Sequence, residues 1–359
     1  MMKNILKSNT ARLIGSIVAL TVVVSAGVVA NTSASAATAT PKAFKIALIG
    51  DMPYDDLGLQ QAPNVINAIN KSKVDLALFD GDTMSGKGNK CTDEAYPALK
   101  TGFFDKFTKP VFYSVGDNEW VDCDRPVKGA YDPATRLALV RSNFFGTAGN
   151  YISLGKKNSA IVVEHDPNYP EMTMFTYKKI TFVLPHVPGS ANNAAVKAPY
   201  KVYNDLTTDG DDAEYKARDA ANVAWINKGF QEAIAKKSLG VIVVVQANMD
   251  WEGYQAAADK EFTAAFDNVK QALLTNTLAF KKPVLLQNGD EHWYQVDMPM
   301  NETAGKLVQR DKGLLVANFT RVQTFGSGFN HWVELTIDPK NSQLWTITPK
   351  LVTANISTH

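Results

Sequence analysis

Short apolar runs alternate with longer amphipathic stretches along most of this chain. Runs such as 76–79 and 241–245 have the length of strands, and stretches such as 213–236 and 260–280 have helical spacing. Strands interleaved with helices are typical of an α/β protein, and unbroken apolar runs favour strands that are covered on both faces. The sequence therefore predicts an α/β fold with a buried sheet core.

Start signals and spacing predict further elements. Helices are expected at 62–69, 93–107 and 134–145, with Thr92 as the N-cap of the second, and a later strand is expected at 314–319.

The first residues have the parts of a secretory signal. Three basic residues precede an apolar run at 13–30, and an Ala-Ser-Ala sequence ends at Ala36. We predict a signal peptide over residues 1–36, and hence a secreted, extracellular or periplasmic protein. A retained membrane anchor is the alternative, because the apolar run approaches the ~18 residues that span a bilayer. No linker, internal repeat or second apolar span follows, so we predict one domain over residues 43–353.

Charge argues against a nucleic-acid partner. Three of the 37 Lys and Arg residues lie in the predicted signal, so the mature chain has 34 basic and 36 acidic residues. Its formal charge is then about −2, and no basic stripe with interleaved aromatic residues is present. We expect no binding of nucleic acid.

Polar sequences bearing a carboxylate or an amide directly follow the apolar runs. They are Gly50-Asp51, Gly81-Asp82, Gly116-Asp117-Asn118-Glu119, Gln246 and Gly289-Asp290-Glu291-His292. Ligands of α/β sheets bind outside the carboxyl ends of strands, where such loops converge, and the neighbouring glycines let the backbone approach a ligand closely. A single Gly-Asp pair is most often a turn, but four in chain order favour a functional site.

Four aspartates in one cluster would raise one another's pKa unless a cation balances their charge. The four are Asp51, Asp82, Asp117 and Asp290. A pair of divalent metal ions would resolve the repulsion, hold a phosphate group and lower the pKa of a bound water. The pattern therefore predicts a two-metal site.

The two cysteines and several aromatic residues stand beside these sequences. Export to an oxidising compartment predicts a disulfide between Cys91 and Cys123, which would tie together the loops after the second and third polar sequences. Two buried free thiols are the alternative, and two thiolates alone would leave a four-ligand zinc site unfilled. For Tyr54, Trp120 and Trp293, packing in the core is favoured over stacking on a substrate ring.

In its order, the series of polar sequences resembles the five motif blocks of calcineurin-like metallophosphoesterases, over about residues 44–300. The family pattern is Asp-x-His, Gly-Asp, Gly-Asn-His-Asp/Glu, a lone His after a strand, and Gly-His-x-His. The resemblance implies a single-domain β-sandwich flanked by helices, with loops that meet over two metal ions. It also implies hydrolysis of a phosphate mono- or diester through a metal-activated water.

The first three blocks are matched in part. Asp51 and Asp82 match the family's first aspartate and its bridging aspartate, whereas Pro53 stands where a His ligand belongs. Asp117 replaces the metal-binding Asn. Asn118 replaces the His that the family uses for transition-state stabilisation or acid catalysis.

The last two blocks keep a single histidine. Gln246 takes the place of the lone His, Asp290 replaces the first His of the final block, and His292 matches the second. The substituted positions still offer oxygen, which suits Mg²⁺, Mn²⁺ or Ca²⁺ better than Zn²⁺. We therefore predict two divalent ions held by Asp51, Asp82, Asp117, Gln246, Asp290 and His292.

Proton transfer needs another group, because Asn118 cannot donate a proton as a charged imidazole can. His186, after the predicted strand 180–184, is the first candidate, although an isolated His is more often structural. Glu119 and Arg125 are further candidates. We predict Asn118, His186 and Glu119 as the catalytic residues.

The predicted function is therefore a secreted metal-dependent phosphoesterase that acts on a small-molecule or extracellular phosphate ester, with no membrane anchor after signal cleavage. The alternative is a non-catalytic protein of the same fold that binds a ligand or partner, motivated by the missing histidines. The identity of the substrate, the choice between mono- and diester, and the oligomeric state stay open.

Overall fold

The structure is a computed structural model that describes residues 41–356 apart from 89, 147–149, 196–209 and 254–259. The predicted signal peptide at residues 1–36 lies outside the described residues. The described residues belong to one compact unit. Among the described residues, no helix is long and apolar enough to cross a membrane.

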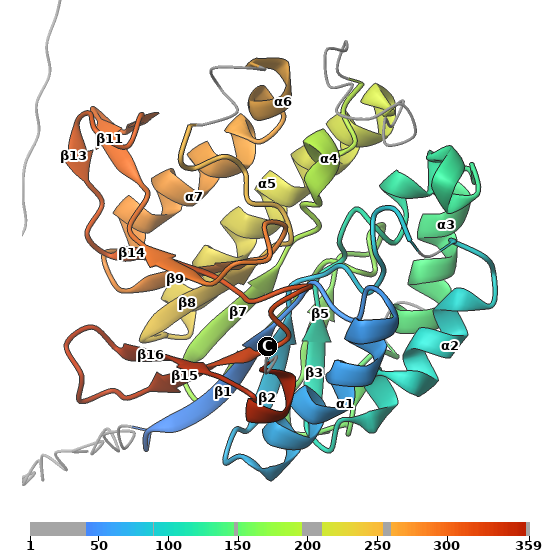
Figure 1. The fold of residues 1–359 in the computed structure, drawn as a ribbon. Coiled ribbons are helices and arrows are strands. Elements are labelled where there is room, and N and C mark those ends of the chain that lie inside the picture. The colour runs from blue at the N-terminus through green and yellow to red at the C-terminus, as the bar shows by residue number, and fades with distance from the viewer. Residues whose placement is uncertain (1–40, 89, 147–149, 196–209, 254–259, 357–359) are drawn as a thin grey trace, which may run out of the picture. The chain divides into compact units, whose positions relative to one another are not determined.

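Two large sheets make up the centre of the fold (Figure 1). The six-stranded sheet has the order β16 (Trp345–Lys350), β15 (Trp332–Ile337), β1 (Phe44–Ile49), β2 (Leu76–Phe79), β3 (Pro110–Tyr113) and β4 (Leu154–Gly155). The seven-stranded sheet has the order β10 (Gln295–Asp297), β14 (Phe319–Gln323), β9 (Val284–Asn288), β8 (Gly240–Val244), β7 (Ile180–Leu184), β6 (Thr173–Tyr177) and β5 (Val163–His165). A small third sheet has the order β12 (Lys306–Val308), β11 (Asn301–Thr303) and β13 (Leu314–Leu315).

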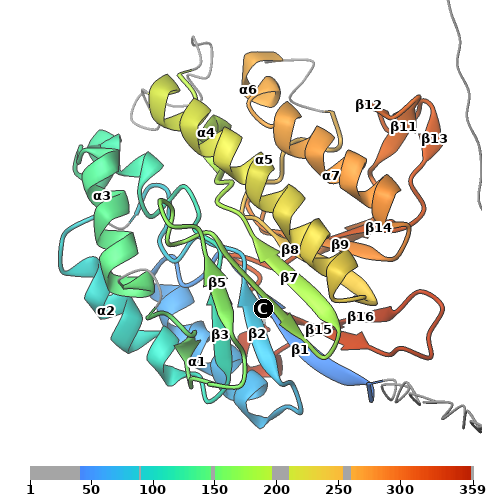
Figure 2. The same ribbon diagram turned by 180° about the vertical axis from the view of Figure 1, so that it is seen from behind.

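Helices cover the outer faces of both large sheets. The six-stranded sheet is flanked by α1 (Asp56–Lys71), α2 (Ala95–Gly102) and α3 (Pro133–Val140). Figure 2 shows α5 (Asp212–Ala235) and α7 (Asp267–Phe280) lying across the seven-stranded sheet. Shorter helical segments are α4 (Gly189–Asn192), α6 (Lys260–Ala264), Phe104–Lys106, Val121–Asp124, Pro126–Lys128, Arg141–Phe145 and Thr353–Asn355. The predicted α/β fold, a β-sandwich flanked by helices, is confirmed.

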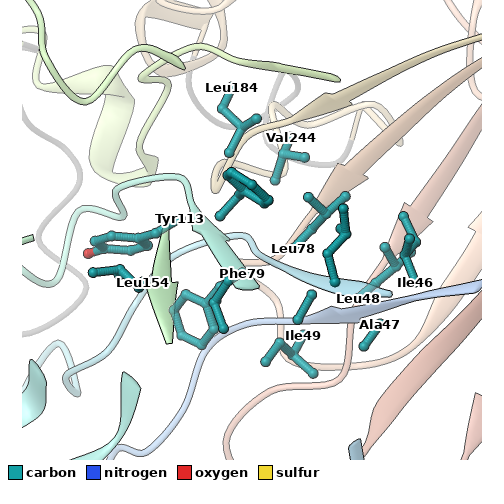
Figure 3. Packing of buried hydrophobic residues seen from close by; sticks show 14 of the residues in the cluster. Ile46, Ala47, Leu48, Ile49, Leu78, Phe79, Tyr113, Leu154, Leu184 and Val244 are labelled. Carbon is teal, nitrogen blue, oxygen red and sulfur yellow. The ribbon is translucent and has the colours of Figure 1, made fainter. Parts of the chain in front are cut away.

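Apolar side chains fill the space between the two sheets. Figure 3 shows Leu48 and Leu78 turned toward Leu184 and Val244 of the facing sheet, and all four are fully buried. Burying such a side chain stabilises the fold by about 1.5–3 kcal/mol. A second cluster, which includes Val243 and residues of α5 and α7, fills the space behind the seven-stranded sheet. The strands are therefore covered on both faces, as their unbroken apolar runs predict.

Strand register brings the functional loops to one edge. In the six-stranded sheet, Phe79 pairs with Ile49 of β1 and with Tyr113 of β3, so these parallel strands end side by side. In the seven-stranded sheet, Val244 of β8 pairs with Gln287 of β9. The loops that follow these strands therefore begin near one another.

Several predicted elements are wrong in their extent, and the helix predicted at 62–69 already begins at Asp56, with Asp55 as its N-cap. The predicted helix at 93–107 is divided into α2 and a short turn, and it begins at Ala95 without a side-chain cap from Thr92. The predicted helix at 260–280 is divided into α6 and α7, separated by a segment that buries Phe266. The predicted strand at 314–319 changes sheet between β13 and β14. Apolar spacing does not mark where the chain changes direction to bury a side chain.

The predicted disulfide between Cys91 and Cys123 is present, with a Cα–Cα distance of 5.8 Å. It joins the segment after β2 to the turn after β3. In the loop-entropy view, a bridge that closes a loop of this length stabilises the fold by roughly 4 kcal/mol.

Candidate functional site

The loops at the carboxyl ends of the parallel strands line a cavity of about 520 Å³. Its lining residues include Asp82, Asp117, Asn118, Asp290 and His292. Asp51 and Gln246 lie just beneath this surface, because both are fully buried and hydrogen-bond to groups in it. The structure therefore brings all six predicted metal-binding residues together.

Four of these six residues adopt a backbone conformation that is unusual for side chains other than glycine. The φ angles are 50° for Asp51, 59° for Asp82, 81° for Asp290 and 69° for His292. Left-handed conformations are sterically unfavourable for most residues and concentrate at functional sites, where the surrounding structure enforces them. The fold thus holds these side chains in directions that regular strands and helices do not supply.

Neutral donors surround the carboxylate of Asp82. Its Oδ2 accepts hydrogen bonds from the Tyr54 hydroxyl at 2.7 Å, from Asn118 Nδ2 at 2.7 Å and from Gln246 Nε2 at 3.1 Å. Its Oδ1 accepts a bond from the backbone N–H of Asn118 at 3.2 Å. The side chain that the family resemblance assigns to both metal ions is therefore held here by uncharged groups.

Two further carboxylates converge on Gly189. A Cβ atom at this glycine would lie 2.9 Å from Asp290 Oδ1 and 3.0 Å from Asp117 Oδ2, so a larger residue would fill the space between them. Asp290 accepts hydrogen bonds from Gln246 Nε2 at 3.2 Å and from the backbone N–H of Asn248 at 3.2 Å. The other oxygen of Asp117, Oδ1, is buried and has no hydrogen-bond partner.

Asp51 contacts this cluster through Asp290. Its Oδ1 accepts a hydrogen bond from the backbone N–H of Asp290 at 3.0 Å, whereas its Oδ2 is buried without a partner. His292 Nε2 lies 3.8 Å from Asp51 Oδ1 and 3.3 Å from the Tyr54 hydroxyl. A histidine and two carboxylates thus surround the Tyr54 hydroxyl.

Burial and mutual repulsion shift the titration of the cluster. Burial, followed by the charge of Asp117, raises the pKa of Asp82 and of Asp290 well above its usual range. Burial and the neighbouring Asp80 do the same for Asp51. Burial lowers the pKa of His292, which favours the neutral imidazole that binds metals. In this cluster, burial and mutual repulsion therefore outweigh the attraction of the nearby Lys128 ammonium.

Of the predicted catalytic residues, Asn118 lines the cavity and Glu119 does not. Glu119 is fully buried, and its Oε1 accepts hydrogen bonds from the Thr83 backbone N–H at 2.7 Å and from the Tyr113 hydroxyl at 2.7 Å. The bond from Thr83 connects the loop after β3 to the loop after β2. The geometry assigns Glu119 to holding the two loops together.

His186 also lies away from the cavity. It is 1% exposed, its Nδ1 lies 2.9 Å from Glu171 Oε1, and the ring of Trp120 packs against it. Glu171 in turn accepts two hydrogen bonds from Arg141, at 2.8 and 2.6 Å. Although burial opposes it, the bonds from His186 and Arg141 lower the pKa of Glu171 to about 2. His186 therefore belongs to a buried ionic network behind the site.

A left-handed turn after β7 was not singled out by the sequence patterns. Its residues Ser190, Ala191, Asn192 and Asn193 have φ angles of 44°, 54°, 54° and 60°. The buried guanidinium of Arg218 holds the turn, because it donates to the Asn192 carbonyl at 2.8 Å and to the Asn192 side chain. Four successive left-handed residues are unusual, and their only sequence signal is a Pro-Gly-Ser run after an apolar strand.

This turn delivers the hydroxyl of Ser190 to the edge of the cavity. Ser190 Oγ lies 2.6 Å from Asp117 Oδ2 and 2.7 Å from Asp122 Oδ1, and it accepts a hydrogen bond from Arg125 Nη2 at 3.2 Å. Arg125 also forms an ion pair with Asp122. Arg125, a candidate from the sequence, therefore lines the cavity together with Ser190.

The donor set can be compared with the needs of a divalent ion. In the part of the chain that the structure describes, no three His, Cys, Asp or Glu side chains are arranged to hold one metal ion as they stand. The unpartnered oxygens of Asp51 and Asp117 and the converging oxygens at Gly189 nevertheless offer the hard, negative ligands that Mg²⁺, Mn²⁺ or Ca²⁺ prefers. The residues fit such ions in chemistry, provided that Asp82 exchanges its neutral donors for an ion.

No family model matches the sequence, and no curated protein matches it. Among solved structures, the chain is similar to a dimetal phosphatase from Danio rerio, with 10% identity and a TM-score of 0.47, over 87% of this chain and 97% of that one. It is also similar to GAP50, the anchor in the inner membrane complex of Plasmodium, with 12% identity and a TM-score of 0.43, over 86% and 89% of the two chains. At these values the similarities carry no evidence on activity.

Proposed function

We propose that this chain is an exported, metal-dependent phosphoesterase that hydrolyses a phosphate mono- or diester. The observation that carries the proposal is the convergence of buried carboxylates, two of them with unpartnered oxygens, at the strand ends of both sheets. Burying uncompensated carboxylates is strongly unfavourable. A divalent cation supplies the missing charge, whereas a binding protein without metal offers no reason to keep such a cluster.

Two overlapping sets of residues would hold the ions. Asp51, Asp82 and His292 would surround one ion, and Asp82, Asp117, Gln246 and Asp290 would surround the other. Bound ions would lower the pKa of a water molecule and neutralise the charge of the phosphoryl group.

The chain's own polar groups would orient the phosphoryl group. Arg125 offers a guanidinium, and Ser190 and Asn118 offer a hydroxyl and an amide, in the wall of the same cavity. A planar guanidinium suits phosphate oxygens because it presents several donors in a fixed geometry.

We propose that Tyr54 supplies a hydrogen-bond donor in place of the histidine that is missing at position 118. Burial and the charge of Asp82 raise the pKa of the Tyr54 hydroxyl well above its usual value, so it stays protonated. We assign it to donating a hydrogen bond to an ester oxygen, since its hydroxyl lies 2.9 Å from Asn118 Nδ2, at the position of the lost imidazole.

Export is the second part of the proposal. It is supported by the basic, apolar and small-residue segments of the N-terminus and by the disulfide, which forms in oxidising compartments. Mass spectrometry of protein from the culture medium or periplasm is expected to find an N-terminus at Ala37. Full-length protein retained in the membrane would contradict cleavage.

Calorimetry tests the metal site without any assumption about substrate. Metal-free mature protein would be titrated with Mg²⁺, Mn²⁺, Ca²⁺ and Zn²⁺, and two ions are expected, with the oxygen-preferring metals favoured over zinc. The best metal would then be used to screen phosphomonoesters and phosphodiesters.

Two variants provide the control for that screen. Asp82→Asn is expected to lose both ions and the activity, whereas Asp105→Asn, at an exposed aspartate, is expected to keep them. Activity that persists in Asp82→Asn would point to a contaminant or another site. Absence of ion binding in the unchanged protein would refute the proposal.

A further inference from the structure

A second cavity lies beside the acidic one, between α1 and α2. It has a volume of about 580 Å³ and is lined mainly by apolar side chains, among them Leu59, Ile66, Ala98, Leu99 and Phe103. Figure 1 shows the two helices next to each other along the six-stranded sheet. We refer to this cavity as the apolar groove.

Small residues keep the groove open. The α1 face that lines it includes Ala62, and the α2 face includes Ala95, Ala98 and Gly102, spaced three or four residues apart. At these positions the helices present one methyl group or none, so side chains do not fill the space between them. Leu59, at the groove, is 53% exposed.

The groove and the acidic cavity share a wall. Pro53 lines the groove, while the next residue, Tyr54, lines the acidic cavity. In the loop after β2, Thr83 and Met84 line the groove, between Asp82 and Ser85 of the acidic cavity. The two spaces therefore lie on opposite sides of the same two loops.

The acidic cavity and the apolar groove differ in the polarity of their linings, and together they suit one bound molecule. The acidic cavity is lined by carboxylates, amides, hydroxyls and the Arg125 guanidinium, which, with metal ions balancing the carboxylates, suit a phosphoryl group and not a hydrocarbon. The groove has the size and the apolar lining of small-molecule sites. A single amphiphilic molecule would satisfy both surfaces at once.

We propose that the apolar groove holds the alkyl chain of the phosphate ester whose phosphoryl group enters the acidic cavity. This inference rests on the proposed function and adds a substrate class to it, the phosphate esters of unbranched alkyl groups. The chain would pass from the acidic cavity around the loop that begins at Ser85 and would lie along α1 and α2.

Non-hydrolysable alkylphosphonates, from ethyl to decyl, test the proposal by calorimetry on the metal-loaded protein. Each methylene that enters the groove is expected to lower the Kd about four-fold, since burying one methylene is worth about 0.8 kcal/mol. Ethylphosphonate is too short to reach the groove and reports on the acidic cavity alone.

A matched pair of variants separates the groove from other causes. Ala98→Trp places a large ring in the groove from an exposed position, so it is expected to abolish the dependence on chain length and to leave ethylphosphonate binding unchanged. Ala220→Trp makes the same change on an exposed face of α5 and is expected to alter neither. Equal thermal midpoints would show that both variants fold.

The outcomes of these experiments distinguish failure of the groove proposal from failure of the proposed phosphoesterase function. Equal affinities for ethyl- and decylphosphonate, or a chain-length dependence that persists in Ala98→Trp, would overturn the groove and leave the phosphoesterase intact. Failure of every phosphonate to bind the metal-loaded protein would overturn both.

Discussion

Two sets of buried carboxylates in this protein differ in the charge of their hydrogen-bond partners. Glu171, behind the site, receives two hydrogen bonds from the Arg141 guanidinium and one contact from His186. Asp82, inside the site, receives its hydrogen bonds from a phenol, two amides and a backbone N–H. Both side chains are almost fully shielded from water, so the difference lies in the charge of their partners.

The pKa directions follow from that difference. Glu171 has a pKa lowered to about 2, whereas burial and Asp117 raise the pKa of Asp82. In the first set, the fold itself offsets the desolvation of the carboxylate with the charge of the Arg141 guanidinium. In the second set, burial and mutual repulsion outweigh the hydrogen bonds to the carboxylates, and the proposed metal site rests on this imbalance.

Removing the charge of Glu171 from its network with Arg141 and His186 is expected to have the largest effect on stability. Glu171→Gln removes the charge that balances Arg141 and is expected to lower the free energy of unfolding by roughly 3–5 kcal/mol. Glu232→Gln removes the partner of Lys236 in an exposed pair and is expected to change it by less than about 0.5 kcal/mol. Urea denaturation of both variants measures the contrast, and similar values would contradict it.

The same network predicts a dependence on pH. The folded-state pKa of Glu171, about 2, lies below its usual value of 4.5, so its contribution is complete above about pH 4.5 and is lost as the pH falls toward 2. Over that window the unchanged protein is expected to lose roughly 3 kcal/mol more than Glu171→Gln does. Denaturation at pH 6, 4 and 3 tests the difference, and parallel curves would refute it.

Removing one neutral hydrogen-bond partner of Asp82 tests whether that partner competes with a metal ion. Tyr54→Phe removes a hydrogen bond to a carboxylate, so metal-free protein is expected to be about 1.5–3 kcal/mol less stable. Stabilisation by added Mn²⁺ is expected to increase, because an ion no longer competes with the hydroxyl. Thermal denaturation with and without Mn²⁺ measures both, and a smaller Mn²⁺ effect in Tyr54→Phe would argue against competition.

A control for this prediction is Tyr215→Phe, which removes a hydrogen bond to the Ala265 carbonyl away from the site. It is expected to lower stability without changing the effect of Mn²⁺.

Neutralising the site itself is expected to have the smallest effect on metal-free stability. In metal-free protein the raised pKa of Asp82 favours its neutral form, so Asp82→Asn changes little charge there, and the net change in stability is expected to stay within about 1 kcal/mol. Stabilisation by Mn²⁺ is expected to disappear. A destabilisation as large as that of Glu171→Gln would show that the two carboxylates play the same role.

The clustering of the acidic residues was accessible from the sequence because these residues follow strands. Parallel strands place their following loops at one edge, so Asp51, Asp82, Asp117 and Asp290 were expected to lie together from their positions alone. Side-chain direction was not accessible. His186 follows β7 in the same way, yet the chain buries it beside Glu171, while the later Ser190 enters the cavity.

The apolar groove was equally hidden from sequence patterns. In the sequence, Ala62, Ala95 and Ala98 are ordinary residues of amphipathic helices. They line one cavity only because α1 lies beside α2 in the folded protein. The divided helix at 260–280 has the same origin, since the burial of Phe266 depends on what lies opposite it.

The sequence by itself determined the alternation of strands and helices, the pairing of its only two cysteines and the order of the acidic loops, because these depend on local periodicity and chain connectivity. Tertiary structure alone decided which carboxylates meet a guanidinium and which meet neutral donors. It also decided which backbone positions are left-handed and where a groove stays open. These features depend on contacts between residues far apart in the chain, and local sequence carries no record of them.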